Sequence, residues 1–226
     1  MMIAYKYLNR PVKFENKNTV VLAVENKDLF RYAIMSLLSG NEDELFVISK
    51  DFVPLDYGKQ VCFVQNPLLL ELKNKRLQTS VNSQLAAALN ELYFEELDAV
   101  QNSISKLIVK LSEETDFNFC SSREVDALSL VKFLDFEPAF SNEDDNDCLM
   151  NLLFYMELMK KHLNIECFIV SNLFLLFSKE ELEAFFNSAK LKNICLVVIE
   201  NSPPSFSSDY FKLAVVDNFL CTIIDD

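Results

Sequence analysis

The fold is decided by seven residues near the N-terminus, Thr19-Val20-Val21-Leu22-Ala23-Val24-Glu25. This run is β-branched and apolar on both faces, which is typical of a strand buried inside a parallel sheet. The residues that follow predict a helix over 27–38, because their apolar positions fall on one helical face. Asn26 is suited to cap the start of this helix and Gly40 to end it.

The turn between this strand and helix lacks the glycines of a nucleotide-binding loop. The chain of 226 residues contains two glycines, Gly40 and Gly58, whereas average composition gives about sixteen. Neither a GxGxxG turn nor a GxxxxGKS/T loop can be formed from them. We therefore predict a nucleotide-binding type of scaffold that binds no nucleotide and serves in binding or assembly.

Further strands are predicted in both terminal thirds of the chain, at 45–49, 61–64, 165–170, 194–199, 213–216 and 219–224. A turn containing Pro54, Asp56 and Gly58 separates the first two of these. The capping box Ser178-Lys179-Glu180-Glu181 opens a helix that runs through Lys190. Since this helix joins two strands, a βαβ unit and a parallel sheet are expected.

The middle third has the periodicity of helices. Leucine, isoleucine and valine recur at steps of three and four from residue 85 to 111, without Gly or Pro from 68 to 137. We expect one long helix or two nearly continuous ones here, and further helices over 124–134 and 148–162. The predicted class is α/β: one sheet assembled from residues 1–80 and 164–226, interrupted by a helical domain of residues 81–163.

Charge is distributed unevenly over these parts. The formal net charge of −13 divides into +2 for residues 1–80 (eleven basic, nine acidic), −10 for 81–163 (six, sixteen) and −5 for the rest (four, nine). Because partner choice follows the local field, the acidic total does not exclude a nucleic-acid partner.

The six cysteines are scattered, which predicts small buried side chains in a reducing compartment. With a single histidine, a Cys/His zinc site is not expected. No apolar run reaches the length of a membrane span, and the N-terminus lacks a signal-peptide pattern. We expect a cytosolic (cytoplasmic) protein that does not insert into membranes.

Four segments carry a resemblance to a known family, in the order in which they occur: Thr19 to Asn26, Lys160 to Asn164 with the strand to Asn172, the helix start at Ser178 to Glu181, and the strand from Leu196 to Glu200. The chain resembles the Csn-two family, the type II-A CRISPR-associated spacer-acquisition proteins. The resemblance implies an α/β head related to P-loop ATPases without their phosphate loop, and a helical leg formed by the insertion. It also implies a homotetrameric ring, stabilised by calcium, that encircles double-stranded DNA, engages its linear ends, and acts with the Cas integrase and the effector nuclease.

The candidate DNA-binding residues are the basic side chains nearest the start of the insertion. They are Lys73, Lys75 and Arg76, joined by Lys50 and Lys59. Lysine and arginine neutralise phosphates without reading sequence, and a ring would multiply each contact. A solvated helix face is the alternative. The loop from Asn201 to Ser205 contains no basic residue, which weakens a DNA role for it.

The candidate calcium ligands are carboxylates of the helical insertion, because calcium takes six to eight oxygen ligands. They are Glu113, Glu114, Asp116, Asp126, Glu143, Asp144 and Asp145. No EF-hand pattern is present, so these carboxylates would have to converge from separate segments. Acidic caps and a solvated acidic face are the alternative.

Catalytic chemistry has little support in the sequence. His162 follows two lysines at a predicted helix end, where a surface charge is expected. Glu200 ends a strand where P-loop ATPases often carry an acidic residue, and without the loop it is expected to be a relic or a hydrogen-bonding group. We predict that the protein is not an enzyme. The alternatives are a degenerate ATPase-like scaffold that binds only protein partners, and a metal-dependent nuclease.

Overall fold

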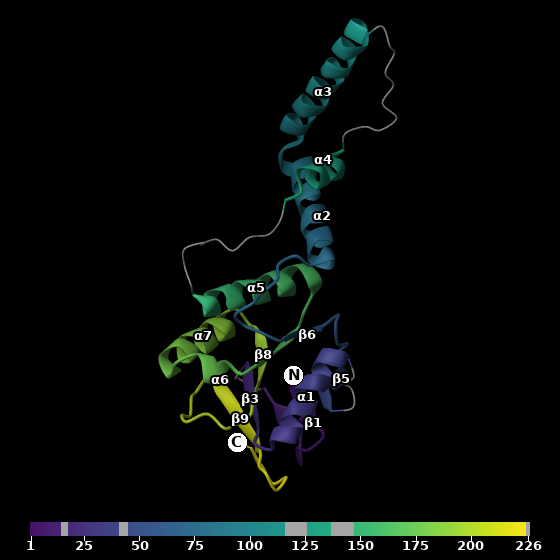
Figure 1. The fold of residues 1–226 in the computed structure, drawn as a ribbon. Coiled ribbons are helices and arrows are strands. Elements are labelled where there is room, and N and C mark those ends of the chain that lie inside the picture. Colours follow the sequence, from purple (N-terminus) through teal and green to yellow (C-terminus); the bar gives the residue numbers. More distant parts are fainter. Residues whose placement is uncertain (15–17, 41–44, 116–125, 137–146, 225–226) are drawn as a thin grey trace. The chain divides into compact units, whose positions relative to one another are not determined.

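A computed structural model describes residues 1–14, 18–40, 45–115, 126–136 and 147–224 (Figure 1). The chain divides into two compact units. The first unit combines residues 1–71 with 140–226, and the second comprises residues 72–139. These limits differ from the predicted 80/81 and 163/164 chiefly because helix α5 (Cys148–Leu163) lies in the first unit.

The first unit is built on a six-stranded sheet, which confirms the predicted α/β class with a mostly parallel sheet. All neighbouring strands are parallel except the edge pair of β9 and β10. The strand order is β10 (Thr222–Ile224), β9 (Phe211–Val216), β3 (Thr19–Val24), β8 (Cys195–Glu200), β7 (Cys167–Ser171) and β6 (Val61–Val64).

Strand β3 is the predicted buried strand, and it lies between β8 and β9 with no exposed residue. Leu22, for example, is in register with Ile199 on one side and Ala214 on the other. An apolar run can be buried on both faces here because helices and a second sheet cover them.

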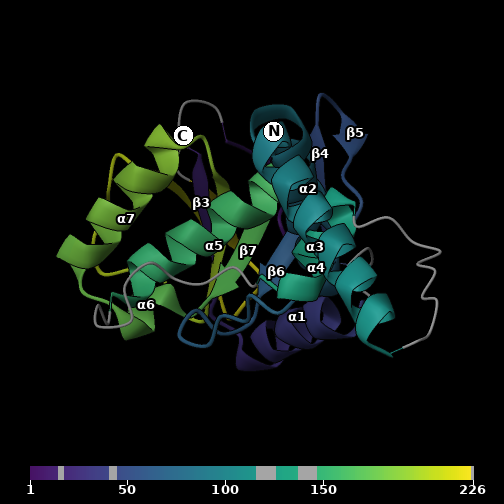
Figure 2. The same ribbon diagram turned by 90° about the horizontal axis from the view of Figure 1, so that it is seen from above.

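One face of the sheet packs on helix α1 (Lys27–Ser39), whose Ala33 and Leu37 join the core of Val20 and Leu22. The opposite face carries α5 and helix α7 (Lys179–Leu191) (Figure 2). There the Phe186 ring of α7 lies 5.7 Å from the Phe211 ring of β9. Tyr155 of α5 contacts Cys62 of β6, with 3.9 Å between Oη and Sγ.

A second sheet corrects the prediction of a single sheet. Its four antiparallel strands are β2 (Val12–Lys13), β1 (Met2–Tyr5), β4 (Phe46–Lys50) and β5 (Val53–Pro54), in that order. Strand β4, expected in the main sheet, pairs along its length with β1, from Met2 with Ser49 to Tyr5 with Phe46. The inward side chains of this pair bury against the α1 face of the main sheet, which gives the unit a third layer.

Left-handed backbone positions explain how the fold manages with two glycines. Gly40 (φ 72°) ends α1, and Gly58 (φ 74°) lies in the turn before β6, both at positions the sequence predicted. Three asparagines take the same conformation elsewhere: Asn164 after α5, Asn172 after β7 and Asn193 before β8. Asparagine tolerates this region better than other residues with a side chain, so it substitutes for glycine here.

The second unit contains the two nearly continuous helices that the sequence predicted, α2 (Lys75–Leu92) and α3 (Phe94–Thr115), followed by α4 (Ala127–Leu134). Its small core is formed by Ala86, Leu97, Ala127 and Val131. The short helix α6 (Leu173–Leu176) of the first unit was not predicted. Within the ranges that the structure describes, no helix is both long and apolar enough to cross a bilayer.

Candidate functional site

The carboxyl ends of β3, β7 and β8 form the edge at which open α/β sheets bind ligands. The residues just beyond these ends are Glu25, Asn172 and Asn201. Their side chains and the start of α1 decide whether a phosphate group can bind at this edge.

The backbone N–H groups at the start of α1 are capped by a side chain of the same segment. Oδ1 of Asn26 accepts hydrogen bonds from the backbone N–H groups of Asp28 and Leu29, both at 3.1 Å. Asp28 adds a carboxylate to the first turn and pairs with Arg31 at 2.7 Å. Because a helix N-terminus attracts anions through its free N–H groups, a cap and a carboxylate there oppose phosphate binding.

The turn after β3 is held by Asn201 from the neighbouring strand. Its Nδ2 donates to the carbonyl oxygens of Val24 at 3.0 Å and Glu25 at 3.4 Å. A side chain thus lies over the switch point between β3 and β8, where a dinucleotide or phosphate loop would require glycine and open space.

Glu200 is a buried acid at the end of β8, with 4% of its surface exposed. Its Oε1 accepts a hydrogen bond from the backbone N–H of Phe174 at 3.1 Å, as expected for a hydrogen-bonding group at a strand end. Burial raises the pKa of Glu200 to about 7, against the lowering effect of the N–H groups of Phe174 and Leu173. The carboxyl group therefore changes charge close to neutral pH.

A cavity of about 440 Å³ opens beside Glu200. Asn172 and Lys179 line it together with the loop from Asn201 to Phe206. The loop that lacked basic residues in the sequence is therefore a wall of this polar cavity.

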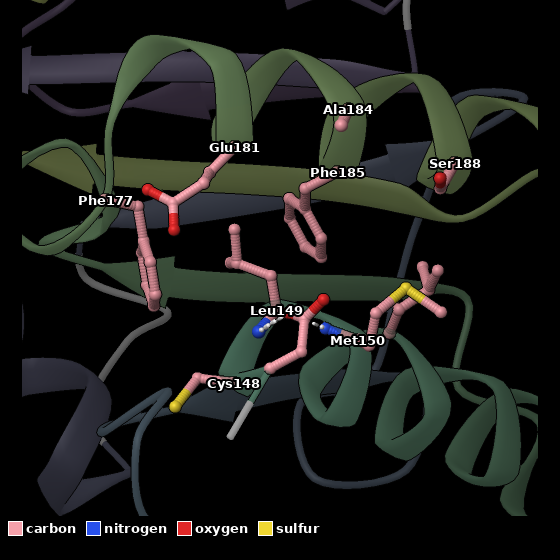
Figure 3. Close-up of a pocket in the computed structure, with 10 residues that line it drawn as sticks. Cys148, Leu149, Met150, Phe177, Glu181, Ala184, Phe185 and Ser188 are labelled. Atoms are coloured by element: carbon pink, nitrogen blue, oxygen red, sulfur yellow. Dashed lines mark hydrogen bonds between the residues drawn. The ribbon is translucent and has the colours of Figure 1, made fainter. Parts of the chain in front are cut away.

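A second cavity, of about 400 Å³, lies between α5 and α7 (Figure 3). Leu149 of α5 and Phe185 of α7 point toward one another inside it, with Phe177 and Glu181 to one side and Met150 to the other. Asp147, the N-cap of α5, also lines it. The sequence predicts a helix over 148–162 and a helix start at Ser178, but no local pattern predicts that these two helices line one cavity.

The predicted DNA-binding residues fall into two groups. Lys73, Lys75 and Arg76 are exposed at the start of α2 in the second unit. Lys50 and Lys59 belong to the first unit, and each pairs with an acid. Lys50 Nζ lies 2.5 Å from Glu166, and Lys59 Nζ lies 2.7 Å from Asp56. The hydrogen bond to Glu166 raises the pKa of Lys50, and the positive charge of Lys50 is paired with this carboxylate.

The predicted calcium ligands are only partly within the described residues. Glu113 and Glu114 lie in the last turn of α3, and Asp126 caps α4 by accepting from Ser129 N–H at 2.6 Å. That hydrogen bond lowers the pKa of Asp126. Asp116, Glu143, Asp144 and Asp145 lie outside the described ranges. In the described part of the chain, no three His, Cys, Asp or Glu side chains cluster as a metal site, and the calcium site stays a prediction.

The sequence predicts no catalytic role for the histidine or the cysteines. His162 lies in the last turn of α5, where partial burial and neighbouring Lys161 lower its pKa. The cysteines that the structure describes are free thiols. Cys167 is buried as expected, whereas Cys221 is exposed.

The fold defines a mixed α/β protein with two sheets, one of them largely parallel, whose chain is interrupted by a helical unit. The family described as CRISPR-associated protein (Cas_Csn2) matches residues 38–218. The chain belongs to this family, as the resemblance had indicated. No curated protein matched the chain.

Proposed function

We propose that the protein is a non-catalytic, ring-forming protein that binds the ends of duplex DNA during CRISPR spacer acquisition. The observation that carries this proposal is the family match, which spans residues 38–218 and both compact units. In this proposal the first unit is a head related to P-loop ATPases, and the second is a helical leg.

The closed edge of the sheet supports a role without nucleotide. Asn26 and Asp28 occupy the start of α1, and Asn201 bridges to the backbone after β3. A head that retains the parallel sheet and fills its phosphate position can still position other surfaces on a rigid scaffold. We propose that those surfaces bind a DNA backbone.

The start of α2 supports a phosphate contact. Lys75 and Arg76 occupy its first turn, which contains no acidic residue. Cations at a helix N-terminus are unfavourable by about 0.3–1 kcal/mol, because they meet the positive end of the dipole. Asn74 already caps this helix, since its Oδ1 accepts from the N–H groups of Arg76 and Leu77. A bound phosphate would therefore be held by the side chains of Lys75 and Arg76, and its negative charge would offset their unfavourable interaction with the dipole.

Helix α3 supports assembly of several copies. Val100, Ile104, Leu107 and Leu111 follow Leu97 at alternating steps of three and four, which is the heptad spacing of a helix-pairing seam. Val100, Leu107 and Leu111 are exposed, with Leu107 at 58%. An antiparallel pair of α3 helices would bring Glu96 of one copy close to Lys110 of the other. We propose that α3 pairs with a second copy in the tetramer, with calcium relieving the acidic charge around Glu113 and Glu114.

Gel shifts of linear and closed-circular duplex of equal length test the DNA role. Assays run across salt, with calcium or with chelator, should show binding of the linear form that falls steeply with salt. Closed circles should bind much more weakly, because a ring threads onto ends. Absence of binding to linear duplex at low salt would refute the proposal, and magnesium-dependent cleavage products would refute its non-catalytic part.

Charge variants at the start of α2 test the contact itself. Lys75→Gln with Arg76→Gln should weaken binding of every duplex equally and lower the salt slope, because phosphate contacts carry no sequence information. Lys50→Gln with Lys59→Gln is the matched control, since it also removes two charges and both lysines are already paired with acids, and its effect should be smaller. Equal losses in both variants would argue against a dedicated contact at α2.

Mixing experiments test the remaining partners. Size-exclusion chromatography should show a tetramer in calcium and a smaller species in chelator. Purified Cas integrase and effector nuclease should co-elute with the tetramer. A monomer under both conditions would count against the ring, and a partner that binds without any DNA affinity would favour the protein scaffold.

A further inference from the structure

The cavity between α5 and α7 has an apolar interior. Leu149, Leu153 and Phe185 line it and are themselves almost completely buried. Met150 and Phe177 stand at its sides (Figure 3). Met150 is 56% exposed, and methionine is common at surfaces that adapt to apolar partners, because its thioether chain is flexible. A large apolar side chain could therefore enter between the two helices.

The rim of the cavity is acidic. Of the ten residues that line it, Asp147 and Glu181 are charged and none is basic. Asp147 uses Oδ1 to accept from the N–H groups of Leu149 and Met150, and Glu181 uses Oε2 to accept from Ser178. Among the described residues no lysine or arginine pairs with either carboxylate. Each carboxylate thus has a second oxygen for a ligand cation.

We propose that this cavity docks a segment of a partner protein in which a large apolar side chain is flanked by lysine or arginine. The apolar side chain would contact Leu149 and Phe185, and the flanking cations would contact Asp147 and Glu181. The acidic rim disfavours the phosphates of nucleic acid and of anionic lipid, so the charge selects a basic polypeptide. This site is separate from the proposed DNA contact at α2.

Short peptides are the probe for this site. The peptide Ac-Ser-Lys-Leu-Phe-Lys-Ser-NH2 is compared with one carrying Glu in place of both Lys, and with one carrying Ser in place of Leu and Phe. Binding is followed in the full chain by the methyl NMR signals of methionine, because Met150 lies at the cavity. The basic apolar peptide should shift the Met150 signal in a saturable manner, and each comparison peptide should bind at least tenfold more weakly.

Two substitutions remove the rim charge without removing the helix caps. Asn caps a helix as well as Asp, and Gln can replace Glu in a capping box. The double variant Asp147→Asn with Glu181→Gln should weaken binding about two- to tenfold, as expected for two partly exposed ion pairs. Glu180→Gln, one position away and outside the cavity, is the matched control and should leave binding unchanged.

Ala184→Trp tests the cavity by filling it from an exposed position of α7, and it should abolish binding. The proposal is overturned if the basic apolar peptide leaves Met150 unshifted, if the acidic peptide binds equally well, or if the double variant binds like the wild type. DNA binding by all these variants should match the wild type, so failure of this site and failure of the proposed function are separate results.

Discussion

The two compact units of this chain use apolar residues in opposite ways. In the first unit every residue of β3 and of β7 is buried, and in β8, which lies between them, all but the first residue are buried. In the second unit, α3 is 22 residues long and buries one of them, Leu97. Apolar side chains farther along α3 are exposed, among them Leu107 and Val109.

The difference indicates where each unit obtains its stability. A sheet covered on both faces gains its free energy from burial within the chain, at about 25 cal/mol per Å² of apolar surface. A helix with an exposed heptad seam gains comparable burial only when another surface covers the seam. The first unit is therefore expected to fold by itself, and the second to depend on assembly.

The largest expected effect concerns the core of the first unit. Phe186 is fully buried, and its ring contacts those of Phe174, Phe185 and Phe211. Phe186→Ala should lower the unfolding free energy by about 3–5 kcal/mol, because the cavity left behind refills poorly. Urea unfolding followed by circular dichroism measures this. Leu175→Ala, at an 80% exposed position, should change it by less than about 0.5 kcal/mol.

Next in size is the pH dependence contributed by Glu200. Its pKa in the folded state is raised from 4.5 to about 7, so this group stabilises the fold fully below pH 4.5 and loses that contribution as pH rises toward 7 and beyond. Each pKa unit is worth about 1.4 kcal/mol, so the loss approaches about 3 kcal/mol.

Glu200→Gln removes this ionisation and retains an oxygen for the N–H of Phe174. The variant should unfold like the wild type at pH 4 and be more stable by up to about 3 kcal/mol at pH 8. If the difference in unfolding free energy between the variant and the wild type is the same at pH 4 and pH 8, the carboxyl group of Glu200 is not desolvated in the folded state. Glu180→Gln, on the surface of α7, is the control and should change stability by less than about 0.5 kcal/mol.

The smallest expected effect on folding, with a clear effect on assembly, concerns the α3 seam. Leu107→Glu should change the unfolding free energy of the dissociated chain by less than about 0.5 kcal/mol, since the side chain is exposed. It should nevertheless shift the oligomer seen by light scattering in calcium toward smaller species. Val109→Glu is the control: Val109 is equally exposed, at 56%, but lies off the seam. If both variants had the same oligomer size, the seam would not take part in assembly.

Local signals made much of the fold predictable from the sequence. The cap at Asn26, the stop at Gly40 and the capping box at Ser178 and Glu181 all depend on residues within a few positions of each other. The buried run at β3 and the heptad-like spacing in α3 are likewise properties of short segments. The second sheet was missed because β1 and β4 pair across more than forty residues, and four residues of β1 carry little pattern of their own.

The sequence by itself therefore determined the types and caps of most elements and the lack of a phosphate-loop motif, because each depends on neighbouring residues. Only the tertiary structure decided what those elements enclose. Asp147 and Glu181 share one cavity because α5 and α7 pack side by side, and Glu200 titrates near neutrality because the end of β8 is covered. Both are effects of burial and proximity between distant segments, and the spacing of residues along the chain carries no record of them.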